Sequence, residues 1–187
     1  MSDFKKARGC EKEGRYQEAA TLYAKHAFDG LLEANFEPEI ELRIGLATML
    51  RAISCDVRAD NYNRAEHLFD IAKPLFREVG DDADSRVLVG LTNEWIGDGL
   101  LMLGSTEAID WYQKANESYE NLEWGERSWG HEQEFHYASI ALESYLTANG
   151  METPKEPHLP LHFTERIEFK IETTEQLLER RPGEEIE

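Results

Sequence analysis

Apolar residues recur every three to four positions along most of the chain, which is the period of an amphipathic helix. The pattern predicts helices at about residues 3–13, 16–33, 39–58, 61–78, 84–103, 105–121, 130–148 and 164–181. Nowhere do apolar and polar residues alternate between turn signals, as they do in a half-buried strand. We therefore expect an all-α fold.

Turn-forming residues divide the first six of these helices into three consecutive pairs. Gly14 separates the first helix from the second, a turn near Asp60 separates the third from the fourth, and Gly104 separates the fifth from the sixth. Such residues are typical of helix ends. Pro74 falls inside the fourth predicted helix, where its missing N–H should kink or stop the helix.

Two of the predicted helices carry apolar residues on more than one face. The segment 84–103 is apolar nearly all round, and the segment 39–58 has apolar residues on two opposite sides. A surface helix of a simple bundle shows a single apolar stripe, whereas two apolar faces need two covering layers. We expect stacked helix pairs, with the 84–103 helix at the centre of the stack.

A pattern of small and aromatic residues repeats along the chain. In "DNYNRAEHLFDIAKPLF" it comprises Asp60, Tyr62, Ala65, Phe69 and Ala72. Small residues at helix crossings let two helix axes approach to roughly 8 Å, and the aromatic ring fills the groove beside them. The spacing resembles that of the tetratricopeptide repeat family.

Two further segments carry part of the same pattern. In "GRYQEAATLYAKHA" it comprises Gly14, Tyr16, Ala19 and Tyr23, with His26 where the family has a small residue. In "GSTEAIDWYQKA" it comprises Gly104, Ala108, Tyr112 and Ala115, and Ile96-Gly97 before it resembles the family's Leu-Gly pair. The equivalent alanines Ala19, Ala65 and Ala108 are 46 and 43 positions apart. The standard repeat is about 34 residues long, so these helices are longer.

The resemblance covers about residues 3–121 and implies a right-handed α-α superhelix of three to four stacked antiparallel helix pairs plus a C-terminal helix. In that family the first helix of each pair lines a concave groove that holds a partner's peptide or chain end. We expect a repeat domain at residues 1–148 and a proline-rich connector at 149–163. A capping helix of the same domain at 164–181 and an acidic tail at 182–187 follow.

The chain carries 38 acidic and 20 basic residues, a formal net charge of -18. Such a charge repels phosphate backbones and anionic lipid surfaces, so we expect neither a nucleic-acid nor a membrane partner. A halophilic source and an ordinary acidic cytosolic protein both agree with this balance. No apolar run reaches the roughly 20 residues of a membrane span, and we expect a cytoplasmic protein whose Cys10 and Cys55 are small buried residues.

The stretch "HEQEFH" is similar to a zinc-protease signature, but its histidines have the wrong spacing. His131 and His136 are five positions apart, about 140° around a helix, so they do not share a metal. Glu132 and His136 are four apart and share a face, and pairing of the two on the helix surface is the simpler interpretation. A metal-binding or enzymatic helical protein that uses Glu132, His136 and the C-terminal histidines His158 and His162 remains the alternative.

Charged residues on the leading helices are the candidate partner-binding groove. Its members are Arg43, Arg51, Arg58, Glu94, Asp98 and His136. We expect the arginines to stand beside the two carboxylates. Two interpretations are open: a mixed-charge groove that binds a peptide, or arginines and acids that satisfy one another across neighbouring helices.

The sequence thus predicts a non-catalytic protein–protein interaction module without a cofactor: an adaptor, a chaperone-like protein or a regulatory protein. The acidic field favours a basic partner. Trp124 and Trp129 flank a short link between helices, where exposed indoles anchor a partner or a second copy, or where they seal the end of the stack. A structural homodimer built through Trp124 and Trp129 is a further alternative.

Overall fold

The computed structural model describes residues 2–33, 38–81, 86–120, 132–153 and 163–179. In this part of the chain the ordered elements are eight α-helices, so the predicted all-α class is confirmed. They are α1 (Asp3–Lys12), α2 (Tyr16–Glu33), α3 (Pro38–Arg58), α4 (Tyr62–Asp81), α5 (Arg86–Met102), α6 (Ala108–Tyr119), α7 (Glu132–Ala148) and α8 (Phe163–Glu179). None of the described helices is both long and apolar enough to cross a bilayer.

Helices α1, α3, α5 and α7 end in the same way. The second residue after each helix has a positive φ: 75° at Gly14, 56° at Asp60, 80° at Gly104 and 69° at Gly150. The next backbone N–H then donates to a carbonyl five positions back, as from Arg15 to Cys10 at 2.9 Å. This arrangement satisfies the last carbonyls of a helix and needs a residue that tolerates the left-handed conformation. The three predicted breaks are therefore confirmed.

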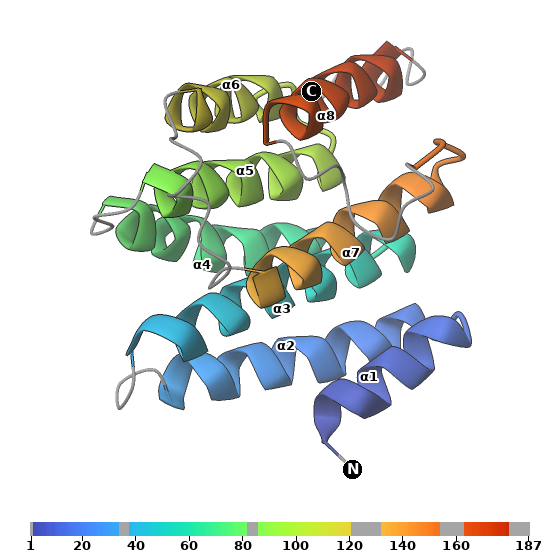
Figure 1. The fold of residues 1–187 in the computed structure, drawn as a ribbon. Coiled ribbons are helices and arrows are strands. Elements are labelled where there is room, and N and C mark those ends of the chain that lie inside the picture. Colours follow the sequence, from blue (N-terminus) through green and yellow to red (C-terminus); the bar gives the residue numbers. More distant parts are fainter. Residues whose placement is uncertain (1, 34–37, 82–85, 121–131, 154–162, 180–187) are drawn as a thin grey trace.

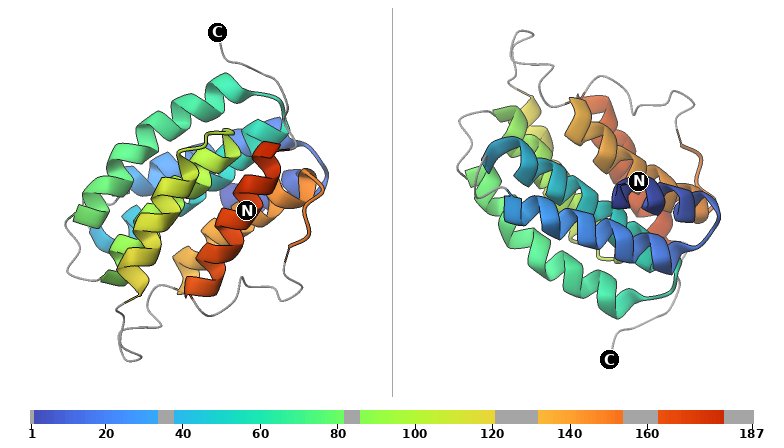
Figure 2. Two further views of the ribbon diagram at one scale, coloured as in Figure 1. Left: turned by 90° about the horizontal axis from the view of Figure 1, so that it is seen from above. Right: turned by 90° about the horizontal axis from the view of Figure 1, so that it is seen from below.

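The first six helices pack in chain order, each against the next (Figure 1). Helix α7 leaves this order and packs across α3 and α5, whereas α8 packs beside α6. The two views of Figure 2 place α4 along one side of the molecule and α7 with α8 along the opposite side. Helices α7 and α8 thus cover different neighbours, rather than packing mainly on each other as a fourth pair.

Helix α5 is the centre of the fold, as predicted. Every residue from Glu94 to Met102 is buried, because α3, α4, α6 and α7 all contact this helix. Helix α3 is similarly buried from Gly45 to Val57, and it lies among α2, α4, α5 and α7. The predicted two-sided burial of both helices is confirmed.

Glycines on α5 allow aromatic rings of α4 and α6 to touch its backbone. A Cβ added at Gly97 would lie 2.5 Å from Cε1 of Tyr112, and one added at Gly90 would lie 2.2 Å from Cε1 of Tyr119. Real Cβ atoms do not approach ring carbons so closely. The two tyrosine rings therefore fill the space that a side chain would need, and the antiparallel helices α5 and α6 come close together.

Both cysteines are buried, and Pro74 lies inside α4. Cys10 and Cys55 are buried free thiols, as predicted, and burial raises the pKa of both. Pro74 does not stop α4, which continues to Asp81. One missing N–H costs less than the helix gains from the buried contacts of Phe69 and Phe76 on either side of it.

We predict that Gly97→Ala destabilises the fold by about 1 to 3 kcal/mol, because the new methyl group displaces the Tyr112 ring in a packed core. Gly9→Ala on α1 is the matched control, since nothing lies within 4 Å of a Cβ there. In that open helix position alanine should stabilise the protein by about 0.5 to 1 kcal/mol. Urea unfolding of both variants measures the difference, and equal effects would contradict the close approach.

Candidate functional site

Two carboxylates lie one helical turn apart on the same face of α5. Glu94 and Asp98 are each about 1% exposed, on a helix that is otherwise almost wholly apolar. A buried carboxylate is costly unless a cation or several donors contact it. Their contacts therefore determine what this face of α5 does.

Helix α8 provides two cations with the matching spacing. Arg166 binds Glu94 through two parallel hydrogen bonds, each 2.7 Å long, from Nε and Nη2. Nζ of Lys170 lies 2.6 Å from Glu94 and donates to both oxygens of Asp98, at 2.6 and 2.8 Å. Because both pairs are spaced i, i+4, one face of α8 matches one face of α5 charge for charge.

Helix α6 completes the network with two phenols. The Tyr112 hydroxyl donates to Asp98 at 2.9 Å, and the Tyr119 hydroxyl donates to Glu94 at 3.0 Å. Burial raises the pKa of both phenols well above the usual range, so they keep the protons that they donate. The Phe163 ring of α8 stacks on Tyr119 with a centroid distance of 4.3 Å, which adds apolar contact at the edge of the network.

The two carboxyls titrate in opposite directions from their usual pKa values. Burial opposes ionisation of Glu94, but the charges of Arg166 and Lys170 outweigh it and lower the pKa to about 2. Burial dominates at Asp98 and raises its pKa to about 6, against the attraction of Lys170 and with the repulsion of Glu94. Asp98 contacts one cation whereas Glu94 contacts two, and the negative charge of Glu94 further disfavours ionisation of Asp98.

A second charge network has the same design at the other end of the molecule. Glu11 of α1 accepts hydrogen bonds from Tyr23 at 2.8 Å, from Arg51 at 2.7 Å and from Arg58 at 3.1 Å. Burial opposes ionisation of Glu11, yet these three donors lower its pKa. The Arg58 guanidinium also lies over the Tyr16 ring, 4.0 Å from its centroid.

The two networks occupy equivalent places in the small-and-aromatic sequence pattern. Tyr23 and Tyr112 hold the same position of the small-and-aromatic pattern, and each donates to a carboxylate on the preceding helix. The cations come from α3 in the first network and from α8 in the second. In the segment that carries the pattern between them, the same position is Phe69, which has no hydroxyl. Helix α8 therefore stands toward α5 and α6 as α3 stands toward α1 and α2.

The predicted groove residues are not brought together. Arg51 and Arg58 bind Glu11, so they do not stand beside Glu94 and Asp98 as expected. The reason is that α8, rather than α3, supplies the cations that neutralise the α5 carboxylates. Arg43 is half-buried on α3. His136 lies on α7, outside the described side chains.

Other predicted features fall outside the part of the chain that the structure describes. These are His131, Trp124, Trp129, His158, His162 and the tail at 182–187. Among the described residues, no three His, Cys, Asp or Glu side chains are grouped to hold a metal ion.

Arg166 and Lys170 are not among the site residues predicted from the sequence. The apolar pattern of the last helix points to a stripe of Ile167, Ile171, Thr174 and Leu178, of which Ile167 and Thr174 are buried and the other two are half-buried. The buried face also contains both cations. A signal for them exists, because two acids one turn apart in an apolar helix require two cations at the same spacing, and α8 carries such a pair.

Comparison of the chain with protein-family models, with curated proteins and with solved structures gave no match. The interpretation of the site therefore depends on its own geometry. Its polar atoms are directed at one another and lie within side chains that are 1 to 2% exposed, so the network joins α8 to α5 and α6.

We predict that Lys170→Met destabilises the protein by about 3 to 5 kcal/mol, because it leaves Asp98 buried without a cation. Adding Asp98→Asn to this variant should recover a substantial part of the loss, since the uncompensated charge is then removed. Lys12→Met at the exposed end of α1 is the control and should change stability by less than about 0.5 kcal/mol. Chemical unfolding of the three variants, compared with wild type, tests the pairing of Lys170 with Asp98. Failure of Asp98→Asn to recover stability in the Lys170→Met variant would argue against this pairing.

The two carboxyls also predict a dependence of stability on pH. Asp98 holds its proton more tightly when folded, at a pKa of about 6 against an ordinary 3.8. Asp98 therefore stabilises the folded protein at low pH, and this stabilisation is lost as the pH rises through about 6. Glu94 behaves oppositely: its contribution is present above its ordinary pKa of 4.5 and is lost as the pH falls toward about 2.

When the pH rises from 4 to 6, the free energy of unfolding of the wild type should accordingly fall by about 2 to 3 kcal/mol relative to that of the Asp98→Asn variant. The variant has no proton to release at position 98. Asp110→Asn, at an exposed acid on α6, serves as the control. Denaturant unfolding at several pH values measures the difference. Parallel curves for wild type and Asp98→Asn would contradict the raised pKa.

Proposed function

We propose that this protein is a non-catalytic interaction module with a tetratricopeptide-like superhelical stack, and that it recognises a basic helix of a partner protein. The observation that carries the proposal is the binding of α8 to α5 and α6. Glu94 and Asp98 bind two cations one turn apart on that helix at 2.6 to 2.8 Å. A partner helix with the same spacing of cations presents the same chemistry.

Helix α8 is less enclosed than the helix it corresponds to. Helix α3 is covered by four other helices, whereas the main described contacts of α8 are with α6 and with the α5 carboxylates. The described outer face of α8 is exposed at Glu165, Glu168, Glu172, Glu175, Gln176 and Glu179. A helix held from one side is the one that a partner can replace.

Both surfaces of this contact are partly polar. The buried face of α8 includes Arg166, Lys170, Thr173 and Thr174 beside the apolar Ile167 and Leu177, and the facing surface of α5 presents two carboxylates. Apolar residues of similar volume hold helices together at least as strongly as a buried ion pair does, but they cannot separate into water without a large cost. A charged contact therefore suits a helix that a partner helix replaces.

The charge of the whole molecule supports a basic partner. A formal charge of -18 attracts cationic segments over roughly 8 Å at physiological salt and accelerates their encounter with the protein. At the stack end, the partner helix would take the place of α8. The protein would then act as an adaptor, a chaperone-like protein or a regulatory protein whose own helix competes with the partner.

A peptide of residues 163–179 serves as the probe for this proposal. We expect it to bind the full-length Arg166→Ala/Lys170→Ala variant in a one-to-one complex, at least tenfold more tightly than it binds wild type, in which α8 competes. Fluorescence anisotropy of the labelled peptide measures both affinities. A peptide that carries the same two alanines should bind the variant at least tenfold more weakly than the unchanged peptide.

Circular dichroism first establishes that the variant keeps its helices. If it does not, amide exchange of α8 in the wild-type chain with excess peptide replaces the anisotropy measurement, and faster exchange in α8 is the expected result. Absence of binding in the folded variant, or equal binding of the two peptides, would refute recognition through the paired cations.

A further inference from the structure

The indole of Trp111 lies under three cations on the side of the molecule that carries α4. Nζ of Lys114 is 4.1 Å from the ring centroid, Cζ of Arg77 is 5.0 Å away and Nζ of Lys73 is 5.8 Å away. Two of these residues come from α4 and the other from α6, so the cluster bridges the two helices. Trp111 itself is 9% exposed, and the cations cover it from solvent.

These three cations are weakly neutralised for so acidic a protein. With 38 acidic residues against 20 basic ones, a basic side chain usually finds a carboxylate, as Arg166 and Lys170 do. In the described part of the chain, Arg77 and Lys114 have no carboxylate within 4.0 Å, and Lys73 reaches Glu107 at the 4.0 Å limit. Three like charges around one ring repel each other and attract an anion.

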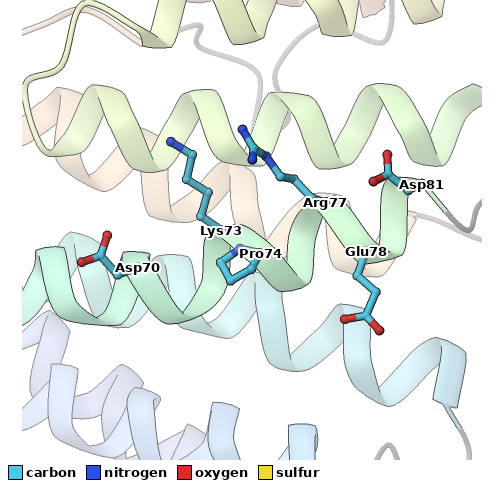
Figure 3. A pocket seen from close by; sticks show the side chains of 6 residues that line it. All are labelled: Asp70, Lys73, Pro74, Arg77, Glu78 and Asp81. Atoms are coloured by element: carbon cyan, nitrogen blue, oxygen red, sulfur yellow. The ribbon is translucent and has the colours of Figure 1, made fainter.

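A hollow of about 480 Å³ opens beside this cluster on α4. Figure 3 shows Lys73 and Arg77 directed toward the neighbouring helices, with Pro74 between them on the α4 surface. Three carboxylates also line the hollow: Asp70, Glu78 and Asp81. A ligand that fits must therefore place negative charge on the cations without extending it along the whole of α4.

We propose that this surface, formed by Lys73, Arg77 and Lys114 around Trp111, binds a short acidic segment of a partner protein. Carboxylates of the segment contact the three cations, and the flanking Asp70, Glu78 and Asp81 limit the length of the negative run. These carboxylates and the formal charge of -18 repel a continuous polyanion such as a nucleic acid, so its binding is disfavoured. Charge complementarity here is the reverse of that at the α5 carboxylates. Lys73 and Arg77 belong to α4, which lies on the opposite side of the molecule from α8 (Figure 2).

The test uses the full-length protein and an acetylated peptide of four glutamates separated by glycines. Titration followed by ¹H–¹⁵N spectra should shift the Trp111 indole signal, which is assigned by its loss in Trp111→Phe. The dissociation constant should rise at least tenfold in Arg77→Glu/Lys114→Glu, and it should also rise with added salt. The control Lys5→Glu/Lys12→Glu changes the net charge equally at exposed positions on α1 and should leave the affinity within twofold of wild type.

Three results would overturn the proposal. One is an equal loss of peptide affinity in the two double variants, which would show a response to net charge alone. Another is equally tight binding of a thymidine oligonucleotide of the same charge, which would remove the preference for a protein segment. The last is self-association that Arg77→Glu/Lys114→Glu abolishes in sedimentation, which would make a second copy of this chain the occupant. None of these results depends on the binding of the α8 peptide, so the two proposals succeed or fail separately.

Discussion

Buried carboxylates that obtain their cations from a distant part of the chain are the constraint on which this fold depends. Glu94 is buried and Glu11 is half-buried, each within a helix pair, and neither pair contains the arginine that contacts its carboxylate. Arg51 comes from α3 and Arg166 from α8. Because an unpaired buried charge costs several kcal/mol, each pair is incomplete until the next cationic helix packs on it.

The same tyrosines couple this electrostatic requirement to packing. The Tyr112 ring fills the space beside Gly97, while its hydroxyl reaches Asp98. Tyr119 does the same at Gly90 and Glu94. A shift of α6 along α5 would therefore break the ring contact and the hydrogen bond together. The charge network fixes the register of the helices, a property that an apolar interface of similar area provides less sharply.

Much of this architecture follows from local sequence. The positive-φ residues Gly14, Asp60 and Gly104 mark helix ends, and the double apolar faces of α3 and α5 indicate their central position. These features were predictable because each depends on neighbouring residues alone. The partners of Glu94 and Asp98 were not, since Arg166 and Lys170 are 72 positions away and α7, which comes between them in the chain, packs elsewhere. Periodicity assigns a face to a helix but does not identify the helix that covers it.

The charge networks at the two ends of the molecule use the same chemistry with different consequences. At the first network, α3 supplies the cations and is itself enclosed by α2, α4, α5 and α7, so its removal would dismantle the core. At the second network, α8 supplies the cations from the end of the chain and keeps an exposed acidic outer face. The cost of separating a helix grows with the surface it buries. A similar ion-pair design is therefore part of the core at one end, whereas at the other it joins α8 mainly to α5 and α6.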